Sequence, residues 1–256
     1  MRTNAMSPHI RIERPAAAPG VQVIRLDRPE KKNAITRAMY AAMTGALTAG
    51  DDDEAVRATV FLGMEGCFSA GNDLADFMTA AEDGVMGAEV LAFLHALAAH
   101  RKPLLSGVDG LAIGIGTTIH LHCDLTYASD RAVFRTPFVD LGLVPEAASS
   151  LLAPRVMGHQ RAFALLAAGE TFSAAAAREA GLIYVVVAPD MLEEATLAAA
   201  AGLAARPAAA LAIARDLLRD ERQAVADRID LEAAHFARQL QSPEARAALA
   251  AFLDRR

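Results

Sequence analysis

Two glycine-containing segments are places where the backbone could do chemistry. In residues 58–74, which end in FSAGNDL, and in residues 103–118, PLLSGVDGLAIGIGTT, an apolar run that predicts a strand leads into a glycine turn and then a helix start. Glycine lets the backbone approach a ligand, and a helix start presents unbonded N–H groups to negative charge. Two such turns facing one another would direct two N–H groups at one oxygen. That arrangement is an oxyanion hole, suited to a thioester carbonyl that becomes an enolate.

One acidic residue, Glu146 in the segment LGLVPEAASS, is the candidate proton carrier. It precedes a predicted helix, and the apolar residues Phe138, Leu143 and Val144 lie near it in sequence. Burial in an apolar pocket disfavours the charged form of a carboxyl group and raises its pKa, which suits proton transfer. The alternative is that Glu146 is a helix N-terminal acid favoured by the helix dipole, and the two roles are compatible.

Other titratable residues are weaker candidates. Asp140 could be a second acid, and His95 could line an acyl pocket, although a core or interface histidine is the simpler interpretation. His120 and His122 lie two positions apart on a predicted helix, so they point to different faces and form no helical metal pair. The two cysteines lie far apart without a CxxC pattern. No metal-ligand spacing, GxGxxG fingerprint or P-loop occurs, and no metal site is predicted.

The elements that must position these residues alternate between strands and helices over the first 190 residues, which predicts an α/β core with parallel strands. A helix is expected to begin after the N-cap Thr36 and to run to about Ala49. The acidic run at 51–54 is interpreted as a solvated loop. The predicted strands are 9–13, 21–27, 58–64, 104–109, 125–129, 132–136 and 182–187. The other predicted helices cover about 74–79, 85–99, 116–122 and most of the chain from 147 onward.

Composition limits the class of protein. The chain has 256 residues, 54% hydrophobic and 22% charged, which excludes a disordered chain. Its net charge of −6 argues against general attraction to nucleic acid or to an anionic membrane. The N-terminus shows no apolar signal region and no apolar stretch is long enough to span a membrane, so a cytoplasmic protein is expected. Only three basic residues are lysine, and two of them, Lys31 and Lys32, are adjacent.

The chain resembles the crotonase superfamily, also called the enoyl-CoA hydratase/isomerase family. The matching segments follow the family's order over nearly the whole chain: LDRPEKKNAIT, FSAGNDL, KPLLSGVDGLAIGIGTT, CDLTYASDRAVFRTPFVDLGLVPE, GETFSAAAAREAGLIYVVV and AAFLDRR. The resemblance implies a ββα spiral core over residues 1–190, and a C-terminal helical trimerisation region over 191–256 within the same unit. It further implies an acyl-CoA substrate, no cofactor apart from the coenzyme A of the thioester, and a homotrimer or a dimer of trimers.

The family's motifs, matched residue by residue, assign the site. The two oxyanion donors correspond to the backbone N–H groups of Asn72 and Ile115. Many members have glycine in place of Ile115, but the N–H group is the same. The resemblance places coenzyme A along Lys32, Ala34, Ala70, Asn72, Asp73 and Leu74, and near the tail residues Phe252 and Arg255, of the same or a neighbouring subunit. The lysine pair would offer ammonium groups to the coenzyme A phosphates, although a solvated turn is the alternative.

The acidic residues distinguish reactions within the family. Hydratases similar to this chain hold a water between two glutamates, at places that correspond to Thr118 and Phe138, and neither residue can transfer a proton. Glu146 instead matches the single glutamate of peroxisomal-type Δ3,Δ2-enoyl-CoA isomerases, which implies conversion of a 3-enoyl-CoA to a 2-trans-enoyl-CoA. Relatives with other chemistry also use a carboxylate there. The alternatives are a hydratase, another enolate reaction such as hydrolysis or decarboxylation, and a non-catalytic homologue that binds coenzyme A or RNA.

Overall fold

Two sheets form the framework of the protein. The structure is a computed structural model that describes residues 7–73, 75–76, 87–219 and 221–253. For residues 252 and 253 it describes the backbone alone. The larger sheet has the order β1 (Ile10–Glu13), β2 (Val21–Leu26), β3 (Ala58–Leu62), β5 (Leu104–Val108), β7 (Leu125–Ser129) and β10 (Val185–Val187). The smaller sheet has the order β4 (Cys67–Ser69), β6 (Leu111–Ile113), β8 (Val133–Arg135) and β9 (Phe172–Ser173). Pairing is antiparallel between β1 and β2 and between β8 and β9, and parallel between the other neighbours.

The two sheets are built alternately along the chain. Strands β3, β5 and β7 of the larger sheet are each followed by one strand of the smaller sheet, namely β4, β6 and β8. A helical segment then leads away from each strand of the smaller sheet. After β4 this is α3 (Ala88–Ala99), after β6 it is α4 (Ile115–Thr118) with the 3-10 helix η2 (Ile119–His122), and after β8 it is α5 (Ser149–Leu166). The predicted ββα repeat is therefore present. Its consequence is that the carboxyl ends of β4 and β6, where the glycine turns begin, lie side by side.

Helices cover both faces of the larger sheet. Every residue of β3 and β5 is buried, as expected for a parallel sheet that is covered on both sides. One face packs against α1 (Arg37–Asp52) and α3, through residues such as Phe61, Met39 and Phe93. The other face packs against α7 (Leu192–Ala204), through residues such as Val60 and Ala200. Helix α7, the first of the predicted C-terminal region, thus completes the core, and a role of that region in trimerisation stays a prediction.

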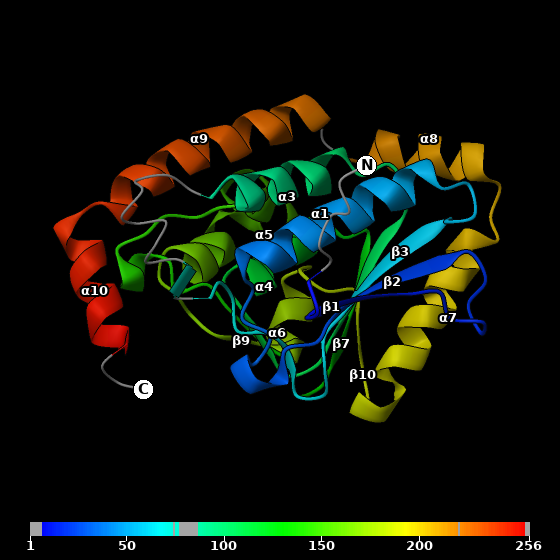
Figure 1. Cartoon of the computed structure of the whole chain (residues 1–256), viewed down its shortest axis with the longest axis horizontal. Coiled ribbons are helices and arrows are strands. Elements are labelled where there is room, and N and C mark those ends of the chain that lie inside the picture. The colour runs from blue at the N-terminus through cyan, green and yellow to red at the C-terminus, as the bar shows by residue number, and fades with distance from the viewer. Residues whose placement is uncertain (1–6, 74, 77–86, 220, 254–256) are drawn as a thin grey trace.

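The remaining helices extend from this core. They are α6 (Ala174–Glu179), α8 (Ala208–Leu218), α9 (Arg222–Leu240) and α10 (Pro243–Leu253), with short 3-10 helices η1 (Pro29–Lys31), η3 (Val139–Leu141) and η4 (Pro189–Met191). Figure 1 shows α9 lying along α3, and α10 at the end of the molecule remote from α7. Within the described residues no single helix is long and apolar enough to cross a membrane, although the pair Pro189–Ala204 and Ala208–Leu218, bent by 110°, passes the same test when combined.

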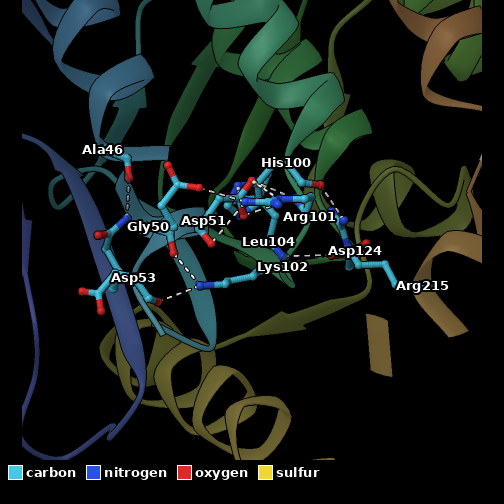
Figure 2. Close-up of polar contacts among 12 residues, drawn as sticks. Ala46, Gly50, Asp51, Asp53, His100, Arg101, Lys102, Leu104, Asp124 and Arg215 are labelled. Atoms are coloured by element: carbon cyan, nitrogen blue, oxygen red, sulfur yellow. Dashed lines mark hydrogen bonds and ion pairs between the residues drawn. The ribbon is translucent and has the colours of Figure 1, made fainter. Parts of the chain in front are cut away.

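The start of α1 agrees with the sequence prediction and its end does not. Thr36 Oγ1 accepts a hydrogen bond from the Met39 N–H group at 3.3 Å, which is the predicted N-cap. The helix continues to Asp52, so the acidic run is not simply a solvated loop. Asp51 accepts from the backbone N–H of Arg101 at 3.0 Å and lies 3.1 Å from Nδ1 of the buried His100 (Figure 2). These partners at the end of α3 are what hold the last turn of α1 in place.

Candidate active site

Glu146 is buried, and the loop that carries it has an unusual backbone. Glu146 is 3% exposed, and the next two residues, Ala147 (φ 59°) and Ala148 (φ 54°), both have a left-handed backbone conformation. Such a conformation costs a residue with a Cβ atom about 1 kcal/mol or more, so the surrounding contacts must enforce it. One of these contacts is the Nε2–H group of buried His122, which donates to the Ala147 carbonyl oxygen at 2.7 Å.

A threonine orients the Glu146 carboxyl group. The hydroxyl of Thr118, at the end of α4, donates to Glu146 Oε1 at 2.5 Å, and Thr118 is fully buried. Thr118 stands where the hydratases of the resemblance carry a glutamate, and Phe138, at their other position, is a buried phenyl ring. No described residue donates a hydrogen bond to Oε2 of Glu146. One oxygen is thus fixed and the other is left for chemistry.

Burial raises the pKa of Glu146 to about 8, with a smaller upward contribution from the charge of Glu232 and a downward one from the Thr118 hydrogen bond. The direction agrees with the expectation from its apolar neighbours. A carboxyl group with a pKa near the working pH can both accept and return a proton. The alternative role as a helix N-terminal acid stays a prediction, and the hydrogen bonds at the N-terminus of α5 go to a different glutamate.

That glutamate is Glu232 of α9, which sequence reasoning missed. Its Oε1 accepts from the Ser150 N–H group at 2.9 Å and from the Ser150 hydroxyl at 2.5 Å, and its Oε2 is buried without a hydrogen-bond partner. Burial raises its pKa, as it does that of Glu146. The signal for it was available: Val225, Ile229, Phe236 and Leu240 form the buried stripe of α9, and Glu232 falls within this stripe. An acid in an apolar stripe needs a buried partner.

The two glycine turns are in van der Waals contact. A Cβ atom on Gly71 would lie 2.9 Å from the Ile113 carbonyl oxygen, and one on Gly116 would lie 2.9 Å from the Ser69 carbonyl oxygen. Both distances are too short for a real Cβ atom, so glycine is required if the turns are to approach this closely. The approach brings the backbone of Asn72, after the first turn, close to that of Ile115 in the second.

Neither the N–H group of Asn72 nor that of Ile115 donates to an acceptor among the described residues. Asn72 forms a parallel bridge with Ile35, in which Ile35 N–H donates to Gly71 O at 2.8 Å and Asp73 N–H donates to Ile35 O at 2.9 Å. This pairing leaves the intervening Asn72 N–H group unused. Ile115 is the first residue of α4, where N–H groups have no partner within the helix. Both groups are therefore available to an external oxygen.

Tyr40 of α1 is a second residue that sequence reasoning missed. Its ring is buried against Phe93, with ring centroids 5.4 Å apart, and its hydroxyl donates a short hydrogen bond to Asn72 Oδ1. Burial and the charge of Glu146 both raise the pKa of Tyr40. The sequence pattern favours a core aromatic at this position, and only the fold shows that the hydroxyl reaches the glycine turn. One cavity is lined by Tyr40, Asn72 and Glu146 together with Ile35, Arg37, Asp73, Asp76, Gly87, Val90, Phe236 and Leu240.

The segments that the resemblance assigns to coenzyme A lie beside one another. Ala70 N–H donates to Lys32 O at 2.9 Å, which joins the two segments next to the Ile35–Asn72 bridge and near Ala34. Lys31 and Lys32 are exposed. Asp73 instead accepts from Arg28 Nη1 at 2.6 Å, so its carboxylate shapes the loop. Leu74 and Arg255 lie outside the described residues, and Phe252 is placed in α10 only by its backbone.

The weaker candidates do not join the site. Asp140 is exposed and accepts from Arg135 Nη2 at 2.8 Å, and His95 of α3 pairs with Asp230 of α9 at 2.9 Å. Within the part of the chain that the structure describes, no group of three or more side chains is arranged to hold a metal ion. The chemistry available is therefore that of one carboxyl group of raised pKa and two spare backbone N–H groups, of which that of Asn72 belongs to a residue lining the same cavity as Glu146.

Comparisons with known proteins agree with this geometry. A family model described as enoyl-CoA hydratase/isomerase matches residues 16–256. The chain is 38% identical over 205 residues to enoyl-CoA delta isomerase 2 of Rattus norvegicus (78% of this chain, 52% of that one), and 37% identical over 199 residues to a probable enoyl-CoA hydratase of Rhizobium meliloti (75% and 76%). It thus spans about half the length of the rat protein. The solved structure of Pseudomonas aeruginosa OdaA superposes with a TM-score of 0.91 at 38% identity, over 96% of this chain and 99% of that one.

Proposed function

The chain belongs to the enoyl-CoA hydratase/isomerase family, and we propose that this acyl-CoA enzyme converts a 3-enoyl-CoA to a 2-trans-enoyl-CoA with Glu146 as its proton carrier. The crotonase-like fold predicted from the sequence is confirmed by the superposition on solved relatives. The finer assignment rests on one observation: Glu146 faces the cavity with no second acid at the positions of Thr118 and Phe138.

Isomerisation needs one base that acts twice. The ionised Glu146 takes a proton from C2 of the 3-enoyl thioester, and the electron pair of the broken C–H bond moves into the C1–C2 bond while the carbonyl oxygen becomes anionic. The N–H groups of Asn72 and Ile115 bind that oxygen. The protonated Glu146 then delivers the proton to C4, the C3–C4 double bond moves to C2–C3, and the carbonyl re-forms. The same carboxylate is regenerated, so no water or second acid is consumed.

The raised pKa of Glu146 supports this double role. An acid with a pKa of about 8 is a strong enough base to accept a proton from a carbon acid whose enolate is stabilised, and it returns the proton readily. The hydrogen bond from Thr118 holds one carboxyl oxygen, and the other serves both C2 and C4. Apolar side chains of Ile35, Val90 and Phe236 in the cavity wall keep the site poor in water.

The coenzyme A part of the substrate is proposed to lie along the segments around Lys32 and Ala70, with the exposed ammonium groups of Lys31 and Lys32 facing its phosphates. Two point charges on the protein surface suit the flexible diphosphate and phosphate groups of coenzyme A. No cofactor beyond the thioester itself enters this mechanism. Assembly as a homotrimer or a dimer of trimers belongs to the same proposal, and light scattering that gave a monomer mass would contradict it.

Two assays on the unaltered enzyme test the reaction. A 3-enoyl-CoA and a 2-enoyl-CoA of the same chain length are supplied separately, and the absorbance of the conjugated thioester is followed. The isomerase should increase this absorbance with the first substrate and leave it unchanged with the second. Loss of absorbance with the second substrate would instead show addition of water, the activity named for the Rhizobium meliloti relative. It would also overturn the argument from Thr118 and Phe138.

A further inference from the structure

A second cavity, of about 450 Å³, lies between α3, η2, α5, α8 and α9 and shares no lining residue with the cavity around Glu146. Most of its wall is apolar, formed by Ala98, Pro103, Leu121, Leu125, Leu152, Val156, Leu203, Leu211, Ala214, Leu218 and Val225. Helix α9 reaches both cavities, through Val225 here and Phe236 at the active site. These residues are 11 positions apart, so the two sites are separated by about 16 Å along the helix.

One end of this apolar cavity carries guanidinium groups. Arg215 is 5% exposed, although it lies on α8, whose other described residues are not buried. Its Nε donates to Asp124 Oδ2 at 2.7 Å and its Nη1 donates to the His100 carbonyl oxygen at 2.7 Å (Figure 2). Its Nη2 is buried without a hydrogen-bond partner. A buried charged donor without an acceptor is costly, and it leaves the positive charge of Arg215 incompletely compensated at this end of the cavity.

Arg219, one turn further along, is less well paired. Its side chain is 25% exposed, and its one ion pair among the described residues joins Nη1 to Asp124 Oδ1 at 3.4 Å, longer than a good hydrogen bond. Burial and the neighbouring charge of Arg215 lower its pKa. A guanidinium group has five N–H donors, so most of those of Arg219 remain available.

The charges at this end do not balance. Asp124 is the one acidic side chain among the described residues that line the cavity, and it serves Arg215, Arg219 and the Leu104 N–H group together. The third lining arginine, Arg222, pairs with Asp216 at 2.6 Å. Three guanidinium groups therefore face two carboxylates. One positive charge, on the pair Arg215 and Arg219, is left to attract an anion.

We propose that this cavity is a second ligand site, which binds a medium-chain carboxylate with its anionic head at Arg219 and Arg215 and its alkyl tail along the apolar wall. Arginine binds a carboxylate through two parallel hydrogen bonds, which the unused N–H donors of Arg219 can supply, while the buried guanidinium group of Arg215 adds its charge. The tail would cover side chains such as Leu121, Leu152 and Val225. Both parts of the site are needed to define this ligand. The apolar wall favours an alkyl tail, and the uncompensated positive charge favours a carboxylate over a neutral head group.

Calorimetric titration with octanoate tests the site. Octanoate should bind the unaltered protein with one ligand per chain, whereas acetate, which has the charge without the tail, and octan-1-ol, which has the tail without the charge, should bind at least tenfold more weakly. Arg219→Gln should weaken octanoate at least tenfold. Arg206→Gln, which removes an exposed charge outside the cavity, should leave it unchanged. Equal binding of octanol, or equal affinity in Arg219→Gln, would overturn the proposal.

Competition separates this site from the active site. Octanoate affinity should be the same in the presence of saturating acetyl-CoA and in Glu146→Gln, since neither change touches the second cavity. Loss of octanoate binding under acetyl-CoA would place the ligand in the acyl pocket and refute the second site. Absence of octanoate binding to the unaltered protein would also refute the second site. This is the result expected if a neighbouring copy of the chain covers the cavity in solution. The octanol comparison needs no variant, so it remains decisive if Arg219→Gln fails to fold.

Discussion

The hydroxyl of Thr118 donates to Oε1 of Glu146 at 2.5 Å across 28 positions of sequence. At the position where the resemblance places one of the two hydratase glutamates, this chain has a threonine that holds the Glu146 carboxyl group. A hydroxyl group of this kind cannot deliver a proton to substrate at neutral pH, but it stabilises the ionised form of the carboxyl group to which it donates. The hydrogen bond between Thr118 and Glu146 therefore bears both on which reaction the site can perform and on the pKa of Glu146.

Replacement of the proposed base gives the most direct prediction. Glu146→Gln should lower kcat for 3-enoyl-CoA isomerisation by about 10²- to 10⁴-fold, the range for loss of a general acid–base group. The amide oxygen can still accept from Thr118, so the fold and the affinity for coenzyme A should remain. Steady-state kinetics and calorimetry with coenzyme A check the two halves. Undiminished turnover would show that the base lies elsewhere.

The activity of the unaltered enzyme should depend on pH through Glu146. The carboxyl group must be ionised to accept the C2 proton, and its pKa is raised to about 8. Thus kcat/KM should increase with pH up to about 8 and level off above it. A profile that is flat between pH 6 and pH 9 would be incompatible with Glu146 as the base.

Stability should follow the opposite course. The pKa of Glu146 is raised in the folded protein above the ordinary glutamate value of 4.5, so between about pH 4.5 and 8 the folded state holds more protons than the unfolded state. The contribution of this group to stability is then fully present below pH 4.5 and is lost as the pH rises through 8. Glu146→Gln should remove that loss. The difference in Tm between variant and unaltered protein should grow in favour of the variant from pH 5 to pH 8, and a constant difference would contradict burial of an ionisable group.

Thr118→Val keeps the shape of the side chain and removes the hydroxyl. Glu146 would lose the hydrogen bond that lowers its pKa, so the rising limb of the pH profile should move upward by about one pH unit. Thr118→Ser retains a hydroxyl and serves as the control. A pH profile of Thr118→Val that coincides with that of the unaltered enzyme would mean that Thr118 contributes packing alone.

Glu232→Gln should move the same limb the other way. The amide oxygen can still accept from Ser150, but the negative charge that raises the pKa of Glu146 is gone. The limb should therefore shift to lower pH. The opposite signs expected for Thr118→Val and Glu232→Gln separate an effect on titration from general damage to the site, since damage would lower the rate at every pH in both variants.

Tyr40→Phe should affect the oxyanion turn. Loss of the hydrogen bond to Asn72 Oδ1 frees the residue whose N–H group is proposed to bind the substrate oxygen, and small displacements of such groups are costly to the rate. We expect kcat to fall by about tenfold to a hundredfold with little change in KM. Tyr184→Phe, at an exposed ring, is the matched control. Equal kcat in both variants would exclude a positioning role for Tyr40.

The sequence supported predictions that depend on local pattern or on one motif. The N-cap Thr36, the two glycine turns and the burial of Glu146 were all predictable, because capping, glycine requirements and apolar flanks act over a few residues. Tyr40 and Glu232 were not assigned, since helical periodicity shows which face is buried but not which polar group meets it. Asp51 was misplaced for a similar reason: a run of acids suggests solvent until the fold brings His100 and Arg101 beside it. The assignment to a family came from the order of whole motifs rather than from spacing alone.

The anchoring of the Glu146 loop by α9 has a consequence for biosynthesis. The left-handed residues Ala147 and Ala148 are held partly through Ser150 by Glu232, which is translated more than 80 residues later. Domains generally fold as units, beginning at the N-terminus, while the chain leaves the ribosome. A nascent chain that stops short of α9 can pair the strands that carry the two glycine turns, but its loop lacks the partner that enforces the strained turn. We expect the oxyanion site to be assembled first on the growing chain and the base to become fixed only after α9 has emerged.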